Sequence, residues 1–183
     1  MKSNLQIISG KYRGKKLNLP IDARPTQNMA RGALFNIMNG LIDTTKPLSV
    51  WDAFAGSGVF GIECLSRFNS PMVVFTDNAK SSIDTIKKNL ISINETATVE
   101  MVDSVSALSR FGGISDIIFI DPPYSDFGFG VLFVKKLSKI AKSGALVIWE
   151  FEKSQPTPRL DENWEILRDK TYGRARFLFL LKK

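Results

Sequence analysis

Residues 48–61 read Leu-Ser-Val-Trp-Asp-Ala-Phe-Ala-Gly-Ser-Gly-Val-Phe-Gly, an apolar run that reaches an aspartate and then opens into a glycine-containing loop. The apolar run predicts a buried strand over 48–54, and the apolar spacing after it predicts a helix over about 58–68. Gly56 and Gly58 let the backbone turn sharply and let a ligand approach it closely. A strand, a glycine turn and a helix in this order form the first unit of an open α/β sheet, where ligands bind at the carboxyl ends of the strands.

The same alternation continues on both sides of this unit. Strands are predicted at 48–54, 72–77, 98–102, 117–120 and 145–149, and helices near 28–41, 58–68, 79–93, 105–111 and 129–142. Repeated strand–helix units indicate a mostly parallel sheet covered by helices. Two last runs, 164–167 and 176–181, flank Tyr172-Gly173-Arg174 and predict an antiparallel hairpin on that sheet. Five parallel strands and a hairpin are the order of the class I S-adenosylmethionine-dependent methyltransferase fold, a seven-stranded Rossmann-like α/β sheet.

Positive charge is concentrated at the start of the chain. The net charge is +7, and residues 1–31 hold seven basic residues but only one acidic residue. Short strand-like runs at 5–9 and 15–19 flank a basic turn, so we predict a small β-hairpin whose charge suits a polyphosphate partner. We expect residues 1–27 to form an RNA-contacting extension and residues 28–183 to form the catalytic domain. The predicted RNA-binding residues are Lys11, Tyr12, Arg13, Lys15, Lys16, Arg24 and Arg31.

Several kinds of chemistry are disfavoured by the composition. The chain has no histidine and one cysteine, Cys64, so an imidazole base, a zinc ligand set and an internal disulfide are all unexpected. Cys64 lies in an apolar helical pattern and is interpreted as a core residue, which argues against methylation through a cysteine nucleophile. No apolar run approaches the roughly 20 residues of a membrane span, and no signal peptide is visible. We therefore expect a cytoplasmic protein, a monomer, with no metal and no membrane association.

Asp121-Pro122-Pro123-Tyr124 follows the most apolar predicted strand and falls at its carboxyl end. The Asp121 carboxylate and the Pro122 carbonyl can both accept hydrogen bonds from an exocyclic amine, because the backbone between two prolines is stiff and extended. Tyr124 offers a ring on which a base could stack. These three residues are the predicted catalytic residues, and methyl transfer to a planar amine is the chemistry they suggest.

A methyl-donor site is predicted upstream of this run. Gly56, Gly58 and Gly61 alone fit a nicotinamide or flavin dinucleotide site equally well. Asp52 favours S-adenosyl-L-methionine, because a carboxylate there can meet the methionine amino group but would repel a pyrophosphate. Asp77 could accept from the ribose hydroxyls, and Asp103 from the adenine amine. The predicted cofactor-binding residues are Asp52, Phe54, Gly56, Ser57, Gly58, Asp77, Asp103 and Ser104.

Over nearly its whole length the chain resembles the RsmD-type 16S ribosomal RNA guanine-N2 methyltransferases of bacteria. The resemblance rests on Ile8–Leu17, Arg24-Pro25-Thr26, Asp52–Gly58 and Asp121–Tyr124. It implies S-adenosyl-L-methionine as donor and the N2 amine of a guanine in 16S rRNA as acceptor, within the 30S subunit or its precursor. The chain departs from the family pattern at Asn28-Met29-Ala30-Arg31-Gly32, where the family has an Asp-Arg-Val-Arg-Glu-like run.

Two other classes of function stay open on the residues alone. One is an amino-methyltransferase that acts on another planar amine, such as adenine N6 in DNA or RNA or a protein glutamine. The other is a non-catalytic RNA-binding or assembly protein on the same scaffold, an alternative raised by the altered 28–32 segment. The residues Asp121–Tyr124 accept adenine or cytosine as readily as guanine, so the choice of guanine comes from the family resemblance.

Overall fold

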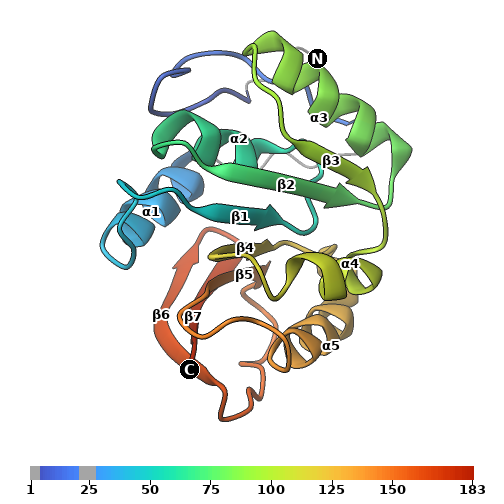
Figure 1. Ribbon diagram of the computed structural model, residues 1–183. Coiled ribbons are helices and arrows are strands. Elements are labelled where there is room, and N and C mark those ends of the chain that lie inside the picture. Colours follow the sequence, from blue (N-terminus) through green and yellow to red (C-terminus); the bar gives the residue numbers. More distant parts are fainter. Residues whose placement is uncertain (1–4, 21–27) are drawn as a thin grey trace.

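The computed structural model describes residues 5–20 and 28–183, which form one seven-stranded sheet with helices on both faces (Figure 1). The strand order is β3-β2-β1-β4-β5-β7-β6, and β7 runs antiparallel to both of its neighbours, β5 and β6. The strands are β1 Ser49–Asp52, β2 Met72–Asp77, β3 Thr98–Met101, β4 Ile117–Ile120, β5 Leu146–Glu152, β6 Trp164–Tyr172 and β7 Ala175–Lys182. The helices are α1 Asn28–Asn39, α2 Val59–Arg67, α3 Lys80–Ser92, α4 Ser104–Phe111 and α5 Phe127–Leu137, with a short 3-10 turn at Tyr124–Asp126.

Two hydrophobic clusters lie on opposite faces of the sheet because successive strand residues point to opposite sides. Helices α1, α2 and α3 cover one face, where the Phe60 ring stacks on Phe119 at 4.1 Å. Helices α4 and α5 cover the other face, where the ring centres of Trp51 and Phe133 lie 5.6 Å apart. Both clusters end at the carboxyl edge of the parallel strands, which leaves that edge open for a site.

The predicted fold class is confirmed, and two strands, β2 and β4, have the predicted bounds. The C-terminal hairpin is longer than predicted, since β6 begins at Trp164 as predicted but runs to Tyr172, five residues beyond the predicted end. Four of the nine residues of β6 are charged, and this edge strand faces solvent over much of its length, so its apolar signal is weak. Helix α5 ends at Leu137, five residues before the predicted end.

The basic N-terminal segment forms a hairpin-like turn with one antiparallel bridge, Gln6 to Lys16, in place of regular strands. Its apolar residues Leu5, Ile7 and Leu17 are buried in the same cluster as α1 and α2. At Gly10, with φ 83°, an added Cβ would lie 1.9 Å from the Ser66 carbonyl oxygen, so only glycine fits. Residues 5–20 are therefore packed into the same hydrophobic core as α1 and α2.

Among the helices in the described ranges, none has the length and apolar character needed to cross a bilayer.

Candidate functional site

Two adjoining cavities open at the carboxyl edge of the parallel strands. The larger has a volume of about 780 Å³ and the smaller about 110 Å³. Phe54, Gly56, Asp121 and Glu150 line both. The larger volume lies in the range of roughly 300–1,000 Å³ that is typical of ligand sites.

The glycine loop between β1 and α2 takes a shape that other residues would strain. Gly56 and Gly58 have φ values of 53° and 75°, in the left-handed region. The Gly56 amide donates to the Asp77 Oδ2 atom at 2.8 Å, and this bond ties the loop to the end of β2. Gly56 lines both cavities, with open space where a Cβ would lie, whereas Gly58 lines neither cavity and faces Ile86 and Phe75.

Asp52 ends β1 inside the smaller cavity and is buried. Its Oδ2 atom accepts a hydrogen bond from the Gly61 amide at 3.1 Å. Burial raises the pKa of Asp52 to about 7, the Gly61 hydrogen bond opposes this, and the nearby Asp77 adds to it. A bound cation would stabilise the ionised form of this carboxylate, and the predicted methionine amino group is such a cation.

Asp77 is the last residue of β2, Asp103 lies two residues after β3, and both line the larger cavity. Asp77 also accepts from the Ala79 amide at 2.9 Å, so its orientation is fixed at the start of α3. Asp103 caps α4 by accepting from the Ser106 amide at 3.0 Å. The Ser104 hydroxyl donates to the Ala53 carbonyl, so this predicted cofactor residue is engaged with the backbone.

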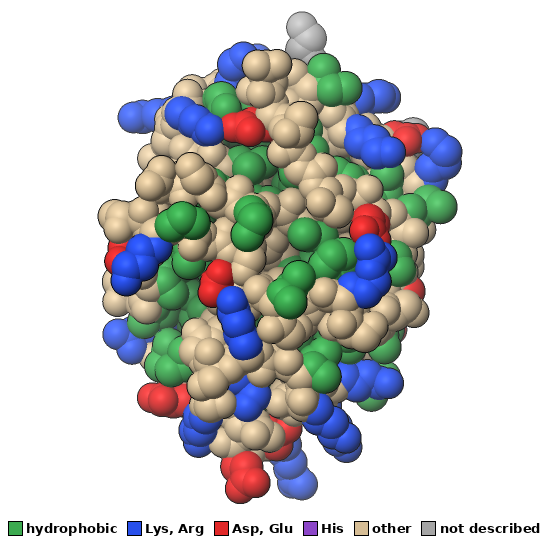
Figure 2. Space-filling model, in the orientation of Figure 1, with side chains coloured by type: hydrophobic (Ala, Val, Ile, Leu, Met, Phe, Trp, Pro, Cys, Tyr) green, Lys and Arg blue, Asp and Glu red, His purple; other side chains and the backbone are tan. Residues whose placement is uncertain are grey.

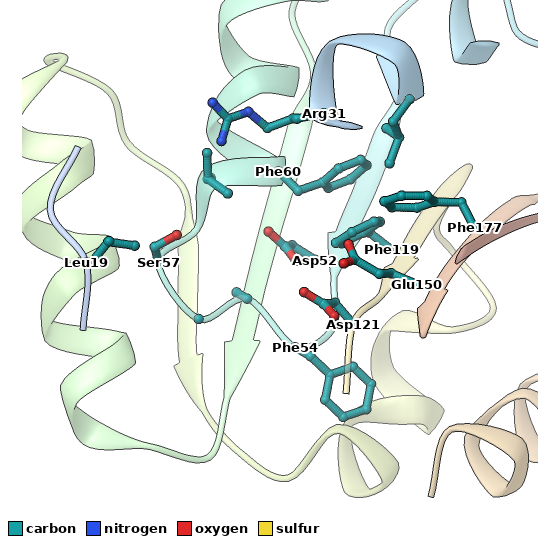
Figure 3. Close-up of a pocket in the computed structure, with 14 residues that line it drawn as sticks. Leu19, Arg31, Asp52, Phe54, Ser57, Phe60, Phe119, Asp121, Glu150 and Phe177 are labelled. Atoms are coloured by element: carbon teal, nitrogen blue, oxygen red, sulfur yellow. The ribbon is translucent and has the colours of Figure 1, made fainter. Parts of the chain in front are cut away.

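Asp121 lies where β4 ends, beside both cavities, and its carboxylate is turned toward those of Asp52 and Glu150 (Figure 3). Burial, then Glu150, then Asp52 raise the pKa of Asp121 well above its usual value. Pro122 is buried and lines the larger cavity. The Pro123 carbonyl accepts from the Asp126 amide at 2.8 Å, which closes the 3-10 turn that Tyr124 begins. The Tyr124 side chain lies outside the described part of the structure, so its stacking role stays a prediction.

The two cavities also contain residues that sequence reasoning missed. They are Asn78, Ser82, Phe129, Glu150, Tyr172 and Arg174. Glu150 carries a signal that could have identified it, because it is an acidic residue inside the otherwise apolar run Leu146–Phe151. Tyr172 and Arg174 carry no such local signal, since they belong to a turn that only the sheet order brings to this edge.

The predicted RNA-binding residues do not gather around the cavity. The Lys11 Nζ and the Tyr12 hydroxyl both donate to Glu95 Oε1 at 2.6 Å, and the bond to Glu95 raises the pKa of Lys11. Arg13 and Lys16 are exposed. The Lys15 Nζ donates to the Ser92 carbonyl at 3.3 Å.

Two predicted RNA contacts need separate comment. Arg31 is 3% exposed, with its Nε 3.2 Å from Glu63 Oε1 and its Nη2 donating to the Gln6 carbonyl at 2.6 Å. A guanidinium buried in this way does not fit the predicted contact with RNA, and it lines the smaller cavity instead. Arg24 lies outside the described residues. On the face shown in Figure 2, basic side chains are spread widely with acidic ones among them.

Comparison with known proteins identifies the family to which this chain belongs. The model of a protein family described as "conserved hypothetical protein 95" matches residues 5–181. A Haemophilus influenzae protein named ribosomal RNA small subunit methyltransferase D is 34% identical over 94% of this chain and 91% of that protein. The chain belongs to this RsmD-type family.

The solved structures agree with the RsmD-type assignment. The putative methyltransferase yhhF from Escherichia coli superposes with a TM-score of 0.85 at 27% identity, over 98% of each chain. A putative class I S-adenosylmethionine-dependent methyltransferase from Listeria monocytogenes shares the fold with a TM-score of 0.70, at 12% identity over 90% of this chain and 62% of that one. The fold of this RsmD-type protein is therefore that of the class I methyltransferases.

Proposed function

We propose that this RsmD-type protein transfers a methyl group from S-adenosyl-L-methionine to the exocyclic N2 amine of a guanine in 16S rRNA. The observation that carries the proposal is the position of Asp121 and Pro122 at the mouth of a cavity that adjoins the glycine loop and Asp52. A hydrogen-bond acceptor for an amine and a site for a cationic donor thus lie side by side. Membership of a family with rRNA methyltransferases among its relatives supports RNA as the acceptor.

The residues present fit the methyl donor, which supplies an electrophilic methyl group on a sulfonium. Asp52 would hold the methionine amino group, because within the described part of the chain its buried carboxylate forms no ion pair and accepts a hydrogen bond from the Gly61 amide. Asp77 would accept from the ribose hydroxyls, and Asp103 from the adenine amine. The backbone of Gly56 would lie against the ligand, and Gly58 would support the turn of the loop behind it.

In this proposal Asp121 orients the amine. Its carboxylate and the Pro122 carbonyl accept one N–H bond each, which turns the nitrogen lone pair toward the methyl donor and stabilises the charge that develops on nitrogen. The nitrogen loses one proton when it gains the methyl group, and the hydrogen bond to Asp121 gives that proton an acceptor. Because the pKa of Asp121 is raised, a cation held beside Asp52 and Glu150 would favour the ionised form that accepts.

The direct test is radiolabelled methyl transfer to small ribosomal subunits from a strain that lacks the modification, followed by mass spectrometry of the labelled base. N2-methylguanine in 16S rRNA is the expected product. Label in DNA or protein, or on another base, would instead identify a different amino-methyltransferase. RNA binding without any label would indicate a non-catalytic assembly protein.

Cofactor affinity should depend on pH through Asp52. Only the ionised carboxylate attracts an ammonium group, so the affinity is full above a pKa of about 7 and falls as the pH drops below it. One pH unit below its pKa a carboxylate is about one-tenth ionised, so binding at pH 6 should be about tenfold weaker than at pH 8. Isothermal titration calorimetry measures this directly. The Asp52→Asn variant should bind weakly with a flat pH profile, and an unchanged slope in that variant would refute the role of Asp52.

The basic turn should contribute to RNA affinity through its exposed cations. Exchanging Arg13 and Lys16 for glutamate should weaken binding to small subunits, with a larger loss at low salt, because phosphate contacts are salt dependent. Lys11 is left intact, since its bond to Glu95 holds the turn in place. The control exchanges Lys135 and Lys136, which are exposed on α5, and filter binding compares the two variants. Equal affinities would rule out an RNA contact at the turn.

A further inference from the structure

The turn between β6 and β7 forms one wall of the larger cavity. Because Glu152 at the end of β5 pairs with Ala175, the turn Gly173-Arg174 lies at the carboxyl edge of the parallel strands. Tyr172 and Arg174 line the same cavity as Asp121 and Pro122. The turn therefore faces the place where the acceptor amine would sit.

This wall is rigidly held. Tyr172 pairs with Ala175, which leaves a two-residue loop, and Gly173 has a φ of 59°, as a tight type II′ turn requires. The Lys153 amide donates to the Arg174 carbonyl at 2.9 Å, which joins the turn to the end of β5. The half-buried Tyr172 ring packs on Phe177 with ring centres 6.1 Å apart. A ring fixed in this way can present a face to a base at little entropic cost.

The charges around the cavity make Arg174 distinctive. Five acidic residues line it, namely Asp77, Asp103, Asp121, Asp126 and Glu150. These carboxylates suit the cationic methyl donor but repel a phosphate group. Of the described residues that line the larger cavity, Arg174 is the single cation, and its side chain is 72% exposed. Its Nη2 donates to Glu152 at 2.5 Å, so one of the five donors of the guanidinium is held at the end of β5.

The basic N-terminal turn cannot bind a phosphate at this cavity, because it lies at the amino ends of the parallel strands. Its partner Ser66 is at the end of α2, before β2 begins, and its partner Glu95 is between α3 and β3. Both positions are at the amino ends of the parallel strands, whereas Asp121 is at a carboxyl end. A phosphate next to the target nucleotide therefore needs a cation other than those of the basic turn.

We propose that the β6–β7 turn is an RNA clamp at the mouth of the site, which rests on the proposed function as an RNA methyltransferase. Arg174, with the exposed Lys153 beside it, holds the backbone phosphate next to the target nucleotide. Tyr172 stacks on the base at the rim and offsets part of the cost of turning the target base out of its stack. Together these residues position a single-stranded or distorted RNA segment over Asp121.

The test compares Arg174→Ala and Tyr172→Ala with the wild-type protein on unmodified small subunits. Each variant should raise KM for the subunits by about tenfold, the effect of one lost phosphate or stacking contact, while S-adenosyl-L-methionine affinity by calorimetry stays unchanged. Arg174→Ala should also reduce the slope of log affinity against log salt by about one unit. Arg174→Lys and Tyr172→Phe should keep most of the wild-type affinity.

Two controls separate the clamp from other causes. Arg168→Ala removes an exposed arginine from β6, the strand that leads into the turn, away from the cavity, and should leave KM unchanged. Glu152→Gln removes the ion-pair partner of Arg174 and should not weaken RNA binding. If Arg174→Ala matches Arg168→Ala, or if Glu152→Gln reproduces its loss, the clamp is refuted. If the wild-type protein itself methylates no RNA, the proposed function fails instead.

Discussion

Asp121→Ala is expected to lower the rate of methyl transfer by about three orders of magnitude, the loss typical of removing a group that stabilises developing charge in a buried site. Asp121 lies at the mouth shared by both cavities, and its pKa is raised by burial and by its carboxylate neighbours. Without this carboxylate the amine would keep one acceptor, the Pro122 carbonyl, and would lose the group that takes its proton. Single-turnover methyl transfer to unmodified small subunits measures the change.

The same variant should bind S-adenosyl-L-methionine nearly as well as the wild-type protein, because Asp52 and Asp77 remain in place. Asp121→Asn is the matched control for shape, since its amide oxygen still accepts one hydrogen bond from the amine but cannot take a proton from it. We expect Asp121→Asn to be intermediate in rate. Calorimetry that showed a lost cofactor affinity in Asp121→Ala would overturn the assignment of Asp121 to the acceptor side.

Glu63→Ala should destabilise the protein by about 3–5 kcal/mol, the cost typical of leaving a buried charge without its partner. Glu63 is fully buried on α2, with Arg31 Nε at 3.2 Å and Arg67 Nε at 2.7 Å. It also accepts from the Ile8 amide at 2.7 Å, so it joins α1, α2 and the N-terminal segment. Denaturant unfolding followed by tryptophan fluorescence measures the loss.

A surface ion pair provides the comparison for Glu63. Glu100 pairs with Arg110, whose side chain is 54% exposed, and such exposed pairs contribute roughly 0–1 kcal/mol. Glu100→Ala should therefore have a small effect on the free energy of unfolding. A loss from Glu63→Ala as small as that from Glu100→Ala would show that the buried cluster does not hold α1 and the N-terminal segment in place.

The sequence by itself determined the fold class and the place in the fold of the residues that we predict to bind the cofactor. The bounds of β2 and β4 follow from their apolar runs, and the loop at Gly56 and Gly58 follows from residues that need a positive φ. Asp52 and Asp77 could be placed at one edge because parallel strands all end on the same side. These features depend on neighbouring residues in the chain, so local pattern is enough to predict them.

Only the tertiary structure decided which distant segments meet at that edge. Glu150 from β5 and the turn at Tyr172–Arg174 reach Asp121 because the sheet order places β5 next to β4 and β7 next to β5. The same packing buries Arg31 against Glu63 and holds the basic turn at the opposite edge. The order of the strands and the ion-pair partner of a charged side chain depend on contacts between residues far apart in the chain. Local periodicity in the sequence therefore cannot predict them.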